Sequence, residues 1–166
     1  MKGKRKSLAS AADFALVRSM TPLDLTKRPP RSPREELLGL CMLPRMIDIA
    51  RAKLPGGEVG QYQIGRGMSA LVLGAVGLSA ERFVEIVRGA ATDQDVAAAL
   101  GRGVAVARRA VGARLSRVTV TDVPVDLRET FQQFYGTDIP SDRLVFDILE
   151  ADDWTTFPDH NADPTS

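Results

Sequence analysis

The fold class of this chain is decided by the stretch LPRMIDIARAKL, which occupies residues 43–54. Within it, Ile47, Ala50 and Leu54 recur at the spacing of an α-helix and therefore predict one apolar face. Pro44 fits the first helical turn, because the N–H that proline lacks would have no partner there. The Pro-Gly-Gly sequence that follows predicts the end of this helix.

Helix signals continue on both sides of this stretch. Upstream, Ser32-Pro33-Arg34-Glu35 has the pattern of a capping box and predicts a helix from Pro33 to about Cys41. Downstream, Ser79 and Thr92 are good helix caps. The apolar periods predict helices at residues 67–76, 79–88, from 92 onward, 104–115, 127–136 and 141–149.

Two segments have weaker patterns. Residues 118–125 are rich in β-branched side chains and favour a short strand, whereas residues 58–64 favour a short strand or an extended loop. Trp154 and Phe157 are expected to pack the end of the chain back onto the core. Together, the patterns predict a mainly α fold: a single compact multi-helix domain with at most one or two short strands.

Charge divides the chain into three parts. Residues 1–20 carry five Lys or Arg against one Asp, and few large apolar side chains, so we expect a flexible basic extension. Residues 21–157 form the expected helical domain. Residues 158–166 form an acidic tail, and the wider segment 150–166 has five Asp or Glu and no Lys or Arg. The formal net charge of +1 hides this asymmetry.

The composition excludes several classes of function. With Cys41 and His160 as the only cysteine and histidine, the chain cannot form an internal disulfide, and zinc ligation or a Ser-His-Asp triad is not expected. We therefore expect no metal and no cofactor. The longest uncharged stretch, residues 67–80, is shorter than the ~20 apolar residues that a membrane helix needs. A lone cysteine in an apolar setting fits a reducing compartment, so we expect the cytoplasm.

The segment from Gly65 to Ala70 matches the glycine-rich dinucleotide fingerprint as a string of letters. That motif binds a pyrophosphate only between a strand and a helix of a βαβ unit. Two predicted helices follow this segment in succession, so the second strand that a βαβ unit requires is missing. We expect a closely packed helix here and no nucleotide.

Two groups of charged residues could contribute to function. Arg45, Asp48 and Arg51 are three residues apart in succession and share one side of the predicted helix. They fit either an exposed ladder of ion pairs or the wall of a polar site. In such a site the arginines bind a carboxylate or phosphate, and Asp48 orients a guanidinium or exchanges protons.

The second group is a basic stretch without any acidic residue between Val96 and Thr121. Its arginines are Arg102, Arg108, Arg109, Arg114 and Arg117. They fit either a solvated face that pairs with an acidic surface or a surface that contacts phosphate. Aromatic side chains for base stacking are absent from this stretch, so nucleic acid is not the expected partner.

A family resemblance rests on three quoted segments. They are DLTKRPPRSPR at residues 24–34, LPRMID with ARA at residues 43–48 and 50–52, and the closing RLVFDILEADDW at residues 143–154. The chain thereby resembles a bacterial family, the domain-of-unknown-function family numbered 5069. This resemblance implies a small, mainly helical cytoplasmic protein and carries no activity with it. It also places Arg31, Arg34, Arg45, Asp48 and Arg51 in the motif, and it gives Tyr62 the position of a Gly-x-Tyr-like segment.

The leading expectation is a protein that binds a small anionic or polar molecule. Arg31, Arg34, Arg45 and Arg51 are the candidate ligand-binding residues. Asp48 and Tyr62 are the candidate catalytic residues for cofactor-free acid–base chemistry, such as isomerisation or cyclisation. The alternative is a non-enzymatic protein-interaction or phosphate-contacting accessory module that uses the arginines of residues 102–117. The sequence sets no oligomeric state.

Overall fold

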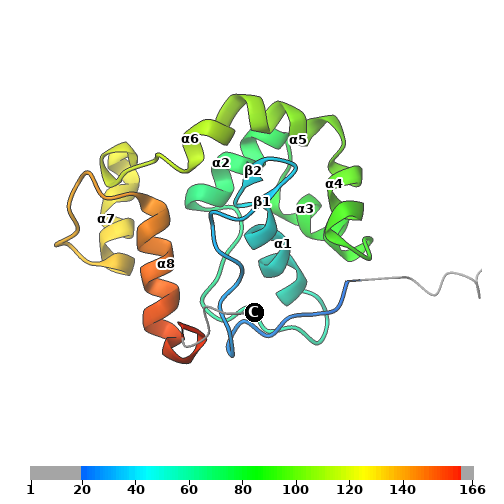
Figure 1. Cartoon of the computed structure of the whole chain (residues 1–166), viewed down its shortest axis with the longest axis horizontal. Coiled ribbons are helices and arrows are strands. Elements are labelled where there is room, and N and C mark those ends of the chain that lie inside the picture. Colours follow the sequence, from blue (N-terminus) through cyan, green and yellow to red (C-terminus); the bar gives the residue numbers. More distant parts are fainter. Residues whose placement is uncertain (1–19, 162–166) are drawn as a thin grey trace, which may run out of the picture.

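Helix α1 (Leu43–Ala52) is the centre of the computed structural model, which describes residues 20–161. Nine of its ten residues are buried, and Figure 1 shows the other elements arranged around it. The predicted helix is confirmed, with Pro44 at its first turn. Its burial is more complete than the periodicity predicts, because even Arg45 and Asp48 are covered.

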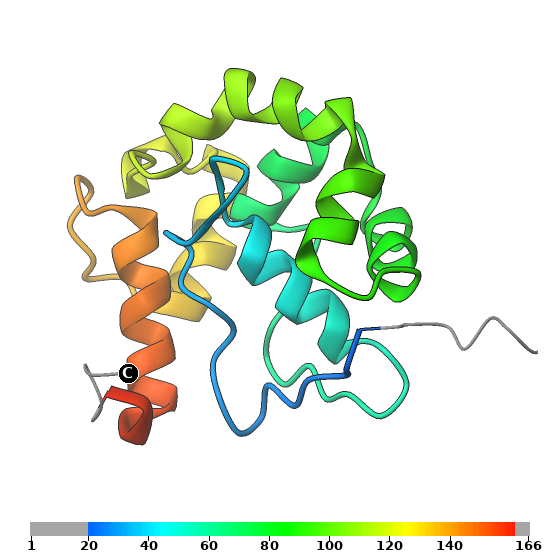
Figure 2. The ribbon, with the colours of Figure 1, turned by 45° about the vertical axis from the view of Figure 1, so that its right-hand side comes forward.

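Four further helices build the body of the fold (Figures 1 and 2). They are α2 (Gly67–Val76), α3 (Ala80–Arg88), α4 (Asp93–Leu100) and α5 (Arg102–Ala107). Helix α3 packs on α1 and α4, whereas α2 packs on α5. Ser79 caps α3, and Thr92 forms a capping box with Asp95 at the start of α4, so both caps are confirmed. The core between these helices is apolar and includes Phe83, Val87 and Val96.

Helix α5 continues through one π-helical turn (Arg108–Gly112) into the short α6 (Ala113–Leu115). The wide turn lies beside Gly39, whose missing side chain leaves room for the Arg108 side chain. The helix predicted at residues 104–115 is therefore present, with a change of helical pitch at residues 108–112.

The helix predicted at residues 33–41 is wrong. A small antiparallel hairpin stands there, made of β1 (Glu36–Leu37) and β2 (Leu40–Cys41). Its tip residues Leu38 and Gly39 have φ of 53° and 73°. The hairpin is favoured because it buries Leu37, Leu40 and Cys41 against the core, which outweighs the local capping signal.

The strand predicted at residues 118–125 is also wrong. Thr119 and Asp122 form a capping box around a 3₁₀ turn, Val120–Asp122, and only Thr119 makes a bridge, to Leu144. Residues 58–64 form an extended loop with a single bridge between Glu58 and Asp24.

Helices α7 (Val125–Tyr135) and α8 (Val145–Thr156) lie side by side at one side of the molecule (Figure 1). Helix α8 begins four residues later than predicted. The residues before it form a turn, in which the Arg143 amide donates to the Pro140 carbonyl, and they are held outside the helix because the Val120 and Thr121 amides donate to the carbonyls of Arg143 and Ser141. It also runs further and is followed by a 3₁₀ turn, Pro158–Asn161.

The two aromatic residues near this end behave differently. Phe157 is partly buried against Leu25, Ile49 and Tyr62, as expected. Trp154 is 53% exposed, so the prediction that it holds this end on the core is wrong. Its neighbour Asp153 points inward instead.

The N-terminal boundary of the domain also moves. Met20 was assigned to the basic extension, but its side chain is buried in the main core. Residues 1–19 of that extension and residues 162–166 of the acidic tail lie outside the described residues. Between residues 20 and 161, no helix combines the length and apolar character needed to cross a membrane.

Candidate functional site

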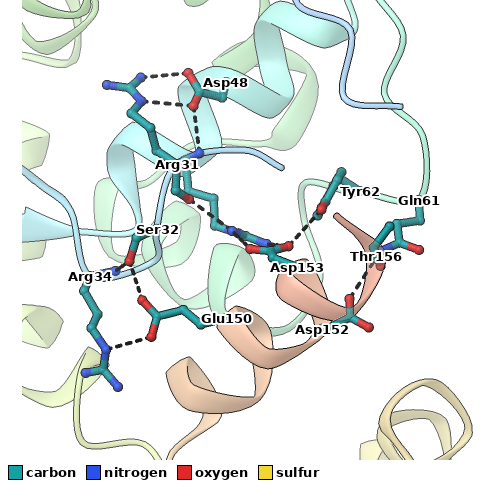
Figure 3. A network of polar contacts seen from close by, with 11 residues as sticks. Arg31, Ser32, Arg34, Asp48, Gln61, Tyr62, Glu150, Asp152, Asp153 and Thr156 are labelled. Carbon is teal, nitrogen blue, oxygen red and sulfur yellow. Dashed lines mark hydrogen bonds and ion pairs between the residues drawn. The ribbon is translucent and has the colours of Figure 1, made fainter. Parts of the chain in front are cut away.

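The predicted site residues meet in a network of arginines and carboxylates on α1 (Figure 3). Its first centre is Asp48, which faces the extended arm that precedes the hairpin. The arm brings Arg31 onto Asp48 in a two-point ion pair, with Nε–Oδ2 and Nη2–Oδ1 distances of 3.0 and 2.9 Å. The Arg31 backbone amide also donates to Asp48, at 2.9 Å. Asp93, at the start of α4, accepts from the remaining guanidinium nitrogen at 2.5 Å.

The second centre is Asp153, which α8 places against Arg45 of α1. Arg45 donates to both of its oxygens, at 2.7 and 3.0 Å, and the Tyr62 hydroxyl donates to Oδ1 at 2.8 Å (Figure 3). The Arg45 guanidinium lies 5.3 Å from the centre of the Tyr62 ring. Arg45 and Asp153 are each only 4% exposed. A bridge to the first centre comes from Arg45 Nη1, which donates to the Arg31 carbonyl at 3.0 Å.

A third group closes the outer edge of the network between the arm and α8. Arg34 pairs with Asp147 and with Glu150, the latter at 3.2 Å. The Ser32 hydroxyl donates to the same Glu150 carboxylate. These contacts hold the arm and α8 together across the surface of α1.

Arg51 has a smaller part than expected. Its Nε donates to the Thr21 carbonyl at 3.0 Å, and its Nη1 lies 3.8 Å from Asp48. Asp48 itself is only 5% exposed, and its main partner is Arg31. Arg45 and Asp48, expected to pair through their spacing, belong to different centres.

The environment shifts the proton affinity of several groups. Burial lowers the pKa of the Arg31 guanidinium, but the hydrogen bonds and charges of Asp48 and Asp93 outweigh it and raise that pKa. Burial and the hydrogen bond to Asp153 raise the pKa of Tyr62 well above that of a free tyrosine. Burial and the nearby Asp153 charge also raise the pKa of Asp152.

Tyr135 on α7 completes this end of the network. Burial raises the pKa of its hydroxyl, and the charges of Asp152 and Asp153 act in the same direction. On the other side of Asp152, the Gln61 amide donates to its carboxylate at 3.2 Å. Asp152 thus lies at the edge of the network, where it is only partly buried.

Local sequence patterns did not predict the carboxylates that pair with these arginines. Asp93, Asp147, Glu150 and Asp153 come from helices that follow their arginine partners by 62 to 116 residues. Helical spacing reports only on neighbours within one helix. The one usable signal was the closing segment of the family motif, which contains Glu150 and Asp153.

The arrangement is that of a structural clamp with few free functional groups. All four candidate arginines donate to carboxylates or carbonyls within the protein. Asp48 is engaged on both oxygens by Arg31, and Tyr62 has its hydroxyl committed to Asp153. A ligand at this point would have to displace these internal partners.

The other expectations about reactive groups can be placed as well. Cys41 is buried, and burial raises the pKa of its thiol to about 11, as expected of a structural cysteine. Gly65 lies before α2, where its amide donates to the Ser69 hydroxyl, with no strand on either side. Among residues 20–161, no group of three His, Cys, Asp or Glu side chains could hold a metal ion.

A second surface is formed by the continuous helix from α5 to α6. The exposed arginines of this helix and of the turn after it, which we call the arginine face, are Arg102, Arg109, Arg114 and Arg117. None of them forms an ion pair with another residue of the described part of the chain. Arg108 differs, because it folds over Gly39 and reaches the Leu38 carbonyl at 3.4 Å. The arginine face therefore presents guanidinium groups that form no internal ion pair among the described residues, although the Arg114 charge is near enough to help lower the pKa of Asp122 after the hydrogen bonds from Thr119.

Comparison with known families assigns the chain. The model of the family described as Domain of unknown function (DUF5069) matches residues 27–154. The chain belongs to this family. The match includes every member of the network from Arg31 to Asp153, together with the arginine face. No curated protein matches the chain.

Proposed function

We propose that this DUF5069 protein is a non-enzymatic accessory module that binds an acidic surface of a partner protein through the arginine face. The observation that carries this proposal is the contrast between two sets of arginines. Those of the network are neutralised by carboxylates, whereas Arg102, Arg109, Arg114 and Arg117 form no ion pair among the described residues. Exposed arginines without an ion pair, on a helix and the turn after it, are well suited to two-point contacts with carboxylates.

An apolar side chain favours a protein partner over nucleic acid. Val106 lies between Arg102 and Arg109 at helical spacing and is 46% exposed. Arginines around an apolar contact are typical of protein interfaces. Nucleic-acid surfaces that read single strands use aromatic side chains, and the helix from α5 to α6 has none.

The test measures binding of a labelled acidic peptide that contains Glu, Asp and Leu. We expect the full chain to bind it, and Arg102→Ala with Arg109→Ala to weaken binding at least about fivefold, since each lost charged contact costs up to about 1 kcal/mol at an exposed site. The matched control is Arg66→Ala with Arg82→Ala, which removes the same charge from other exposed positions.

Two outcomes would overturn this proposal. Equal losses in both double variants would show that only net charge matters. Tighter binding of a nucleic-acid duplex than of the peptide, with a steep salt dependence, would assign the arginine face to phosphate contacts instead.

We also propose a second candidate function, the binding of a small anionic or polar molecule at the open edge of the network. It is supported by Asp152, a partly buried carboxyl group with a raised pKa beside Tyr135 and Gln61. Such a carboxyl could donate a proton in cofactor-free isomerisation or cyclisation, with Arg45 and Tyr62 behind it. A thermal-shift screen of small acids and polyols tests this candidate, and a hit that survives Asp152→Asn would contradict it.

We propose that the protein acts in the cytoplasm. Its single thiol is buried and held protonated, so the fold needs no oxidising compartment. Fractionation of cells that express the tagged full chain would test this location, and recovery from a membrane or secreted fraction would contradict it.

A further inference from the structure

A depression of about 310 Å³ lies where the end of α1 faces α3, and neither the network nor the arginine face contributes to it. It is lined by Lys53, Ile64, Ala80, Glu81, Val84 and Glu85. Its volume falls at the lower end of the range of small-molecule sites.

The sequence builds this depression from a helix face and a loop. Ala80, Glu81, Val84 and Glu85 share one side of α3 because they are one or four residues apart. The loop comes close to this side at Gly65, where an added Cβ atom would lie 3.3 Å from the Ala80 side chain. Gly65 also has φ of 94°, a conformation that favours glycine. The close approach at Gly65 therefore places Ile64 beside Ala80 and Val84, which together form the apolar floor.

Two residues of opposite charge line this depression. Lys53 follows the last residue of α1, and Glu81 stands in the first turn of α3. Hydrogen bonds to the Glu81 carboxylate lower its pKa most, and the nearby charge of Lys53 lowers that pKa further. Within residues 20–161 these two residues do not form an ion pair, whereas Glu85 pairs with Arg88 at 2.6 Å. Lys53 and Glu81 are both exposed and line the same depression, so the charge of each can contact a third molecule there.

We propose that this depression binds a small aliphatic zwitterion of the α-amino-acid class. Its carboxylate would meet Lys53, its ammonium group would meet Glu81, and its side chain would cover Ile64, Ala80 and Val84. Each part of the ligand then has a matching partner: two charges of opposite sign and an apolar surface between them. This site is independent of the function proposed for the arginine face.

The experiment follows backbone amide NMR shifts of the full chain during titration with three probes of similar shape. L-leucine carries both charges. Isopentylamine carries only the ammonium group, and 4-methylpentanoate carries only the carboxylate. We expect leucine to bind with a Kd near 1 mM and to shift the amides of residues 53, 64, 65 and 80–85. Loss of either charge should weaken binding at least about fivefold, because each contact is worth about 1 kcal/mol.

Variants separate the two charged contacts. Lys53→Met should abolish the advantage of leucine over isopentylamine, and Glu81→Gln should abolish its advantage over 4-methylpentanoate. Glu129→Gln, at an exposed position on α7, is the matched control and should leave the leucine titration unchanged. The proposal is overturned if leucine gives no localised shifts up to about 20 mM. Isopentylamine binding as tightly as leucine would also overturn it, because the site would then select cations alone.

Discussion

Asp48 carries the densest set of contacts in the first centre of the network, since it receives two guanidinium bonds and one backbone amide from Arg31. Asp48→Asn keeps the size of the side chain and removes the counter-charge. Removing one partner of a fully buried ion pair costs about 3–5 kcal/mol. Arg31 keeps Asp93 and is 30% exposed, so we expect a loss of about 2–3 kcal/mol in the free energy of unfolding, measured in urea.

A double-mutant cycle identifies the true partner of Asp48. Combining Asp48→Asn with Arg31→Ala should cost less than the sum of the single losses, because no unpaired charge remains. The coupling to Arg31 should exceed the coupling to Arg45 by at least about 1 kcal/mol. A larger coupling to Arg45 would contradict the two-centre arrangement.

Asp152 provides a pH-dependent prediction at the same scale. Burial and the charge of Asp153 raise its pKa in the folded protein above the ordinary value of 3.8, so ionisation of Asp152 opposes folding at neutral pH. Asp152→Asn should therefore increase the free energy of unfolding at pH 7. The gain should shrink as the pH falls toward 3.8 and disappear below it, where the carboxyl is protonated in both states. Urea unfolding between pH 3 and 7 measures this, and a gain that is independent of pH would contradict it.

At the scale of elements, substitution of two glycines tests the hairpin and α2, because alanine is expected to be unfavourable at one position and favourable at the other. Gly39 has φ of 73°, and a Cβ atom there would lie 3.0 Å from Arg108 Cδ. Gly39→Ala should therefore destabilise the protein by about 1–2 kcal/mol. Gly74 lies within α2 with nothing near its Cβ position, so Gly74→Ala should stabilise by about 0.5–1 kcal/mol. Urea unfolding measures both, and equal effects would contradict the assigned conformations.

At the scale of the whole molecule, the network joins parts of the chain that are far apart in sequence. It fixes the extended arm through Arg31 and Ser32, and it fixes α8 through Glu150 and Asp153, so both are held on α1. The arm begins at Met20, which is buried in the core. The folded unit therefore includes Met20, and the composition of residues 1–19 predicts that they add little to its stability.

Two melting curves test this boundary. A chain that begins at Met20 should melt within about 2 °C of the full chain, which corresponds to less than about 1 kcal/mol for a protein of this size. In the full chain, Met20→Ala should cost about 2 kcal/mol or more, because it leaves a cavity in the core. A drop of many degrees on shortening would show that residues 1–19 contribute to folding.

The sequence by itself determined the parts of this protein that depend on near neighbours. The period of residues 43–54, the caps at Ser79 and Thr92, and the stripe that forms α7 are interactions within one turn or two, so they can be read directly. The six candidate site residues, some of them named through the family resemblance, all lie in or beside one network.

Only the tertiary structure decided which charged residues pair and which of the locally predicted helices and strands do not form. Asp153 reaches Arg45 across 108 positions of the chain, and no spacing rule relates them. A hairpin forms after Ser32 in place of the predicted helix, because burial of Leu37 and Leu40 stabilises the fold more than a helix cap does. The start of α8 was set by hydrogen bonds to residues 118–121. Local preferences are worth about 1 kcal/mol or less each, so the distant contacts that bury apolar surface and pair charges decide between them.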